Sequence, residues 1–166
     1  MNMQLMMARA RMNHIPAPVG NIRRWWRIKI TGEASSGSNV TVFEMTIRAT
    51  AGGQNLATGG LAAASSTYSS SFVAAFAFDG NTNSRWAAKG TDPLPYMLAY
   101  RLTSASAVNE ISIMSHLSGF SNWPTSFVVQ SSADSTTGLD GIWSDEWTVT
   151  GQTTWGVNEV RVFTRP

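Results

Sequence analysis

The segment "FDGNTNSRW" (residues 78–86) gathers side-chain oxygens in one short loop. Five of the six residues from Asp79 to Ser84 carry such an oxygen, and Gly80 permits the sharp bend that turns carbonyl groups inward. Hard cations such as calcium bind about 6–8 oxygens from carboxylates, carbonyls and hydroxyls. The loop therefore fits either half of a cation cage or a self-satisfied Asx-turn, in which Asp79 accepts hydrogen bonds from backbone amides.

A second polar loop, "SHLSGFSNWP" (residues 115–124), has the composition of a sugar-binding rim. Recognition of a pyranose needs an aromatic face and hydrogen-bonding tips, and four residues supply them: His116, Phe120, Asn122 and Trp123. Lys89, Asp92 and the loop 51–60 are further candidates for the rim. The alternative is a loop whose aromatic side chains pack on one another or against a neighbouring subunit.

The residue types that catalysis needs form no recognisable pattern in this chain. The two histidines, His14 and His116, lie far apart in the sequence. The motifs of serine hydrolases, zinc proteases and P-loop enzymes are missing. There is no cysteine, which excludes disulfides and thiolate metal sites. We therefore expect a non-enzymatic binding or structural protein.

Basic residues are concentrated near the N-terminus, where six of the twelve lie within the first 29 positions and no acid occurs. Such an arm can contact nucleic-acid phosphates, but docking on an acidic protein surface or simple solvation is the favoured interpretation. Pro16 and Pro18 predict an extended exit from residues 1–20, which we interpret as an arm held by a neighbouring subunit. Arg9 and Arg11 interrupt the only early apolar run, so neither a signal peptide nor a membrane span is expected.

The remaining residues, 21–166, predict one all-β domain. Apolar residues at alternate positions indicate strands at 25–31, 39–49, 96–102, 108–114, 126–132, 146–150 and 157–163. Linkers rich in Gly, Ser and Thr separate them, and this arrangement is typical of a β-sandwich or jelly roll. Trp25 and Trp26 are neighbours on the first strand, so we expect one to face the core and the other to face away.

Four segments of the chain follow one another in an order that resembles that of a known domain family. The oxygen-rich loop stands within "AAFAFDGNTNSRW", and it is followed by "LPYMLAYRL", "VNEISI" and "PTSFVVQSSADSTTGLDGIW". Over about residues 60–145, their order and spacing resemble the discoidin, or coagulation-factor type C, domains. The resemblance implies a galactose-binding-like jelly-roll β-sandwich, a ligand such as a carbohydrate, and core positions for Trp86 and Trp143.

The two ends of the chain depart from that family's pattern. Members usually finish with two strands whose equivalents here, "RRWWRIKI" (23–30) and "VTVFEMTI" (40–47), stand near the beginning. The C-terminal "NEVRVF" resembles the strand that normally precedes them. The chain thus looks like a circular permutation of the family, a layout that we associate by analogy with proteins of bacteriophage particles.

The resemblance also implies a structural calcium ion in the oxygen-rich loop. Its ligands would be main-chain carbonyls and side-chain oxygens of six residues: Phe76, Asp79, Asn81, Ser84, Phe43 and Glu44. Glu159 is the alternative to Glu44 if the permutation is read differently.

Together these features predict a non-enzymatic virion protein that belongs to a larger assembly. It would be a decoration, head-fibre or tail-associated subunit, assembled in the host cytoplasm and carried on the extracellular particle. Its arm would dock on other virion proteins, and its jelly roll would face a host-surface glycan. The alternative is a free glycan-binding lectin, or the accessory carbohydrate-binding module of a secreted glycosidase.

Overall fold

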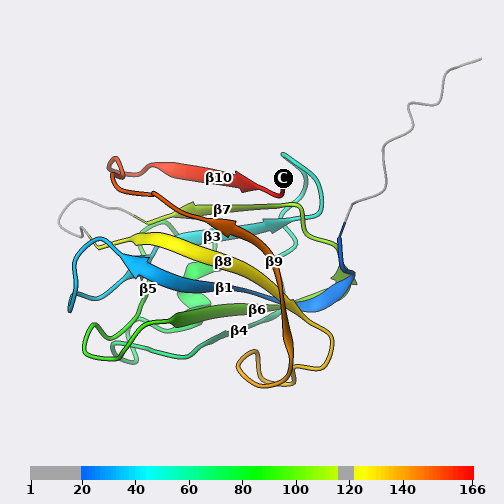
Figure 1. Ribbon diagram of the computed structural model, residues 1–166, viewed down its shortest axis with the longest axis horizontal. Helices are drawn as coiled ribbons and strands as arrows, with labels where there is room; N and C mark the ends of the chain where they lie inside the picture. Colours follow the sequence, from blue (N-terminus) through cyan, green and yellow to red (C-terminus); the bar gives the residue numbers. More distant parts are fainter. Residues whose placement is uncertain (1–19, 116–121) are drawn as a thin grey trace, which may run out of the picture.

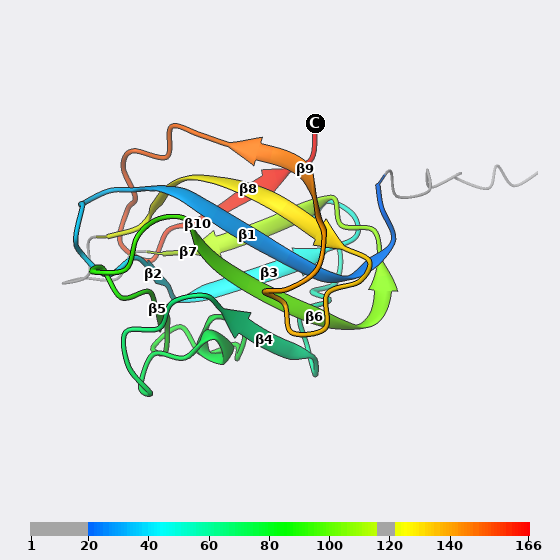
Figure 2. The ribbon, with the colours of Figure 1, turned by 60° about the horizontal axis from the view of Figure 1, so that its bottom comes forward.

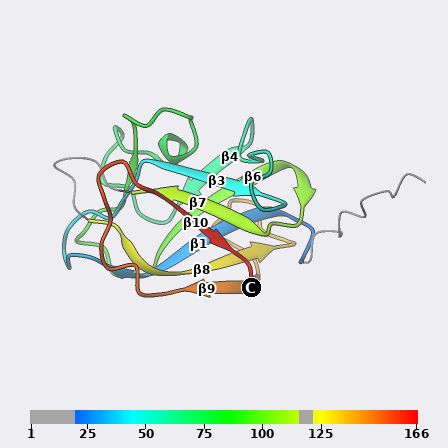
Figure 3. The ribbon, with the colours of Figure 1, turned by 90° about the horizontal axis from the view of Figure 1, so that it is seen from above.

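The computed structural model describes residues 20–115 and 122–166, which form two facing antiparallel sheets. The larger sheet has the strand order β4-β6-β1-β8-β9, and the smaller has the order β10-β7-β3 (Figure 1). Figure 2 shows β9, β8, β1, β6 and β4 following one another across the larger sheet, and in Figure 3 the smaller sheet lies over it. A short pair, β2-β5, and a 3₁₀ turn, η1, complete the described elements.

The larger sheet consists of β4 (Leu61–Ala64), β6 (Tyr96–Ser106), β1 (Arg23–Glu33), β8 (Pro124–Ser132) and β9 (Trp143–Val149). The smaller sheet consists of β10 (Val160–Thr164), β7 (Glu110–Met114) and β3 (Glu44–Arg48). The remaining elements are β2 (Thr41–Val42), β5 (Trp86–Ala87) and η1 (Ala74–Ala77).

The alternation of side chains along β1 builds the core. Trp26, Ile28 and Ile30 are at most 1% exposed, and they face the smaller sheet. Ile28 lies opposite Leu98 of β6 and Val129 of β8, and both of these are also buried. Burial of each such side chain stabilises the fold by about 1.5–3 kcal/mol, so the central position of β1 follows from its apolar face.

The opposite face of β1 is also covered, by a loop rather than by a second sheet. Trp25 points away from the core, and the loop 133–142 packs over it. A Cβ on Gly138 would lie 2.6 Å from the indole ring, and the backbone there has φ +87°, so only glycine fits. The next outward residue, Arg27, stacks on the Trp143 ring with 3.8 Å between the guanidinium carbon and the ring centroid.

The structure confirms the all-β jelly-roll sandwich and most of the expected strands. Trp26 faces the core and Trp25 faces away, and Trp86 is fully buried, as expected. The expected core position of Trp143 is wrong, because this side chain lies on the outer face of β9 against Arg27. Only Gly20 of the expected arm lies within the described residues, so the arm stays a prediction.

One expected strand is divided in two. The sequence pattern predicts a single strand over residues 39–49, whereas β2 ends at Val42 and β3 begins at Glu44. Phe43 between them is fully buried and donates its N–H to the Met114 carbonyl at 2.8 Å. β2 pairs with β5 and β3 pairs with β7, so the break at Phe43 moves the chain from one pairing to another.

Candidate functional site

The oxygen-rich loop follows η1 and is folded by its own side chains. Asp79 Oδ1 accepts a hydrogen bond from the Asn81 N–H at 2.9 Å, and Asn81 Oδ1 accepts one from the Asn83 N–H at 3.1 Å. Gly80 between them has φ +75°, which glycine adopts without steric cost. The Asx-turn that was one of the two sequence interpretations is therefore present.

The same loop also brings together more acceptor oxygens than it has protons to share. Ser84 Oγ lies 2.7 and 3.0 Å from the two carboxylate oxygens of Asp79 and 2.8 Å from the Asn81 carbonyl oxygen. A hydroxyl carries one proton, so it can satisfy one of these three acceptors at a time. A surplus of converging oxygens is what a hard cation requires.

Glu44, the first residue of β3, adds a second carboxylate to this cluster. Burial is the main cause that raises the pKa of Glu44 to about 7, and the neighbouring Asp79 carboxylate contributes in the same direction. Backbone N–H groups of Gly80 and Asn81 oppose the shift. Glu44 Oε1 is buried and has no hydrogen-bond partner. Two facing carboxylates with an unsatisfied oxygen fit a divalent cation, whose charge would balance theirs.

The residues of the loop thus fit the implied calcium ion. Asp79, Glu44, Ser84 and the Asn81 carbonyl lie together, and they are the ones that would hold it. Phe43 directly precedes Glu44, and Phe76 lies in η1 just before the loop, so their carbonyls stay predicted ligands. No group of three or more His, Cys, Asp or Glu side chains occurs among the described residues, so carbonyl and hydroxyl oxygens must complete the coordination.

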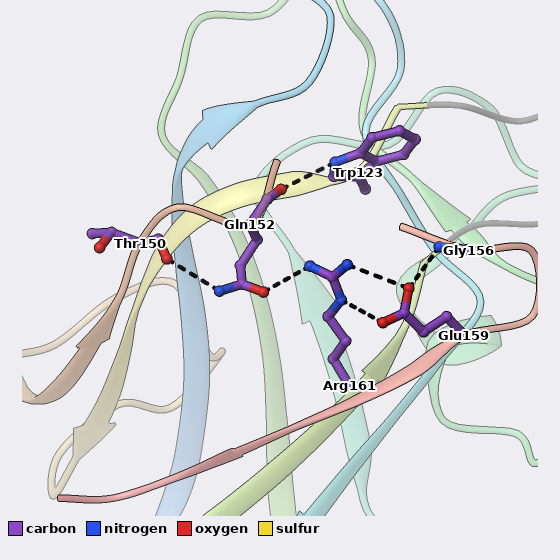
Figure 4. A network of polar contacts seen from close by, with 6 residues as sticks. All are labelled: Trp123, Thr150, Gln152, Gly156, Glu159 and Arg161. Carbon is purple, nitrogen blue, oxygen red and sulfur yellow. Dashed lines mark hydrogen bonds and ion pairs between the residues drawn. The ribbon is translucent and has the colours of Figure 1, made fainter. Parts of the chain in front are cut away.

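The alternative ligand, Glu159, has hydrogen-bond partners of its own. Its carboxylate accepts hydrogen bonds from the Gly156 N–H at 2.6 Å and from Arg161 Nε at 2.8 Å (Figure 4). These donors lower the pKa of Glu159 and keep it ionised. Glu44 is the carboxylate that faces Asp79, and the assignment of Glu159 to the cation cage stays an untested alternative.

The proposed sugar-binding rim is only partly described. His116 and Phe120 lie outside the described residues. Asn122 is 5% exposed, and its amide donates to the Ser38 carbonyl at 2.7 Å and accepts from the Ser35 N–H at 2.9 Å. Both ends of this amide fasten the loop after β1, which contradicts the expectation that Asn122 would face a ligand.

Trp123 keeps a surface position beside fixed polar groups. It is half-buried against the core, and its indole N–H donates to the Gln152 carbonyl at 3.2 Å. The Gln152 side chain in turn accepts from Arg161 Nη1 at 2.9 Å, so Trp123, Gln152 and Arg161 form one connected network (Figure 4). An aromatic side chain next to oriented amide and guanidinium groups is the chemistry of a sugar platform.

The further rim candidates have structural roles or stay untested. The Asp92 carboxylate accepts a hydrogen bond from Ser66 Oγ at 2.7 Å, and Ser66 Oγ also accepts from the Lys89 N–H at 2.9 Å. These bonds hold the connection between β5 and β6 against the segment after β4. The Lys89 side chain is exposed, and its part in ligand binding stays a prediction.

A comparison with known protein families identifies the family to which these features belong. The F5/8 type C domain matches residues 62–163, well over half of the chain. The chain belongs to this family. A search of curated proteins and a search of solved structures each returned no match.

The F5/8 type C match includes the Asp79–Ser84 loop, Trp86 and Trp123. It begins only at residue 62, so β1, β2 and β3 lie outside it. Domains of this family are typically binding modules rather than catalysts, and ligand binding is the function that the family indicates. No helix in the described part of the chain is long and apolar enough to cross a membrane.

Sequence reasoning missed one group of residues on this F5/8 type C domain. Arg23, Arg24 and Arg101 line a common pocket at the start of β1, although Arg101 is far from the other two in the sequence. The signal for Arg101 was its place between Tyr100 and Leu102, whose side chains face the core, since alternation turns it to the outer face. No sequence pattern indicated that β1 and β6 would be neighbours.

The raised pKa of Glu44 predicts a pH-dependent stability in protein freed of metal by a chelator. The unfolded chain releases this proton near pH 4.5 and the folded chain near 7. The protonated carboxyl therefore contributes stability that is fully present below pH 4.5 and is lost as the pH rises through about 7. We expect the melting temperature of the metal-free protein to fall over this range. The control variant Glu44→Gln stays neutral and should lack that part of the fall; identical pH profiles would contradict the raised pKa.

Proposed function

We propose that this protein is a non-enzymatic structural subunit of a virion that displays a circularly permuted F5/8 type C binding domain. The observation that carries the proposal is the place of β1 and β3. Both lie outside the family match, yet β1 pairs between β6 and β8 of the matched region, and β3 pairs with β7.

This pairing supports the permutation. The two N-terminal strands, whose sequences resemble the family's two final strands, lie beside strands of the matched region here: β1 between β6 and β8, and β3 beside β7. A rearrangement of this kind keeps every strand pair and only changes where the chain is cut, so the core packing is unaffected. We associate this permuted order of strands with proteins of bacteriophage particles, and the virion assignment rests on that analogy.

The arm, residues 1–20, supplies the second part of the proposal. It leads into β1 and has basic but no acidic side chains, so an acidic groove on another virion protein suits it. The domain would then face outward as part of an oligomeric particle, with a host-surface glycan as its ligand. Assembly would take place in the host cytoplasm, and no membrane segment takes part.

The cation site is proposed as a structural staple. A calcium ion held by Asp79, Glu44, Ser84 and the Asn81 carbonyl would tie the start of β3 to the loop after η1. It would also remove the repulsion that the two facing carboxylates otherwise exert on each other. Nothing near the cluster suggests that this ion would take part in catalysis.

Calcium should stabilise the folded protein by mass action. At a calcium concentration about 100-fold above the Kd, linkage predicts a rise in melting temperature of about 5–10 °C for a chain of this size. Asp79→Ala and Glu44→Ala should each abolish the response, whereas Asp92→Ala, which alters a carboxylate outside the cluster, should keep it. Protein shown to be metal-free at the start, whose melting curve is unchanged by calcium, would refute the staple.

The virion role is tested by removing the arm. Protein that lacks residues 1–20 should fold, because the strands that build both sheets begin at Arg23, but it should not be incorporated into particles. Incorporation is measured by co-sedimentation of the protein with purified particles. Full incorporation of the truncated protein would show that the arm is not the docking element.

A free lectin or glycosidase accessory module is the second candidate, and the position of Trp123 beside Gln152 and Arg161 favours it. A glycan array on the purified protein separates the two candidates. Binding of a neutral glycan that is lost in Trp123→Ala but kept in Trp143→Ala would support the lectin. Absence of glycan binding, together with arm-dependent incorporation, would support a purely structural role.

A further inference from the structure

A pocket of about 430 Å³ opens on the outer face of the larger sheet, where the chain enters β1. Its most distinctive lining residues are three arginines, Arg23, Arg24 and Arg101, which line it together with Trp25. Figure 1 shows the start of β1 at the opposite end of the sheet from the connection between β1 and β2. Asn122 fastens that connection, so the arginine pocket lies apart from Asn122 and Trp123 and from the function proposed above.

Strand register explains why these residues meet. Trp25 lies directly opposite Arg101 of β6 on one side and Ser132 of β8 on the other, so the three side chains form a row on the outer face. Regular alternation would turn Arg24 toward the core, beside Trp26. A register shift between Arg23 and Trp25 breaks the alternation there, and three consecutive residues can then line one pocket.

The three guanidinium groups have no acidic partner within the described residues. Arg23 Nη1 donates to the Ile22 carbonyl at 3.0 Å and Arg24 Nη2 donates to the Thr103 carbonyl at 2.9 Å, whereas the ion pairs of the described chain involve other arginines. Residues 1–19 and 116–121 contain no Asp or Glu in the sequence, so they cannot supply the missing charge. Three positive charges therefore face one pocket without a carboxylate in direct contact with any of them.

A second hollow strengthens the site. A pocket of about 180 Å³ lies on the β4 side and shares Arg24 and Arg101 with the first. Its wall includes Gly60, where a Cβ would lie 2.0 Å from the Arg101 carbonyl oxygen, so the chain can approach Arg101 this closely only at a glycine. The Arg24 and Arg101 side chains thus stand between two adjoining spaces, and both remain accessible to a ligand.

The opposite wall of the pocket is preorganised. Ser132 and Ser135 line it, and their hydroxyls donate to Asp134 at 3.0 Å and to Asp140 at 2.8 Å. The Ile142 N–H, which donates to Asp134, and the Thr136 hydroxyl, which donates to Asp140, are the main causes that lower the pKa of these two carboxyls, and the serine hydroxyls add to the effect, so both stay ionised. The loop 133–142 is therefore fixed over Trp25, with two negative charges behind the serines.

The negative charges of Asp134 and Asp140 favour a small anionic ligand over a long one. A long polyanion such as duplex DNA would lie along the arginines and also meet Asp134 and Asp140, which repel it. A compact anion can enter the pocket and contact the arginines alone. Guanidinium forks bind carboxylate and phosphate groups through paired hydrogen bonds, and the volume is in the range of small-molecule sites.

We propose that this pocket binds a sugar-sized molecule that carries one compact oxyanion, either a carboxylate, as in a uronic acid, or a phosphate, as in a sugar phosphate. Arg101 and Arg24 bind the oxyanion, and Arg23 supplies a third positive charge at the rim. Ile22, Ala105 and Ala133 offer the apolar surface against which the sugar ring rests.

The experiment is an NMR titration of the ¹⁵N-labelled full-length chain in low salt, with each ligand added up to about 10 mM. The probes are D-glucuronate and glucose 6-phosphate, with D-glucose as the neutral control and a short DNA duplex as the polyanion. We expect one or both anionic sugars to shift the backbone amides of residues 22–25, 101 and 132–135, and D-glucose to leave them unchanged. Whichever anionic sugar binds more tightly identifies the source of the oxyanion.

Matched variants test the assignment. Arg101→Gln and Arg24→Gln should each weaken binding at least about tenfold, because each removes a charge-assisted pair of hydrogen bonds. Lys89→Gln removes the same charge from a side chain that does not line the pocket, and it should leave the affinity within about twofold. Unchanged melting temperatures establish that the variants are folded.

Several results would overturn the proposal. They are equal weakening in Lys89→Gln, equal binding of D-glucose, shifts caused only by DNA, and no shift with any probe. None of these depends on the calcium, particle or glycan experiments, so failure here leaves the proposed function untouched, and failure of that function leaves the pocket untouched.

Discussion

The pairing of β1 between β6 and β8 is the constraint on which the rest of the structure depends. Its inward face contributes Trp26, Ile28 and Ile30 to the core, and the sheet would be split in two without it. Its outward face carries Trp25 and Arg27, which organise the loop 133–142 and the stacked Trp143. One strand with both faces covered therefore fixes the hydrophobic core and the arrangement of the polar surface above it.

The oxygen cluster is governed by a balance of charge rather than by packing. Glu44 and Asp79 are brought together because β3 pairs with β7 while the loop after η1 folds on its own Asx-turns. Each carboxylate alone would be easily solvated, but their proximity and the burial of Glu44 favour a bound proton or a bound cation. The Asx-turns give the loop its shape, and the unsatisfied Glu44 oxygen is the atom that a cation would contact.

The two candidate binding surfaces of the domain lie at opposite ends of the larger sheet. Trp123 and its polar network lie where β8 begins, and the arginine pocket lies where β8 ends and β1 begins. The strands of the larger sheet span the distance between them, and the loops at each end can vary without disturbing the core. This division is common in β-sandwiches, where a rigid scaffold positions loops that carry the binding residues. It allows a neutral surface and a basic surface to exist on one small domain.

The sequence alone determined the fold class and most of the strands, because alternation of apolar residues and turn-forming linkers are local signals. The order of the motifs around Asp79 also identified the family, and three of the oxygens expected in the loop do lie together. The break at Phe43 was visible in principle, since the apolar residues change from even positions (Val40, Val42) to odd ones (Met45, Ile47). The high β propensity on both sides of Phe43 nevertheless predicts one continuous strand, and the short strands β4 and β5 have too few residues to give a pattern.

Only the tertiary structure decided which residues meet across the chain. It placed Glu44 beside Asp79 and the Glu159 carboxylate beside Gly156 and Arg161, although β3 and β10 both pair with β7. It showed that the Asn122 amide holds the loop after β1 instead of facing a ligand. It also brought Arg24 close to Arg101 through a register shift that no local sequence pattern predicts. The physical reason is the same in each case: a strand's propensity is local, whereas its neighbours and register are set by the packing of the whole sandwich.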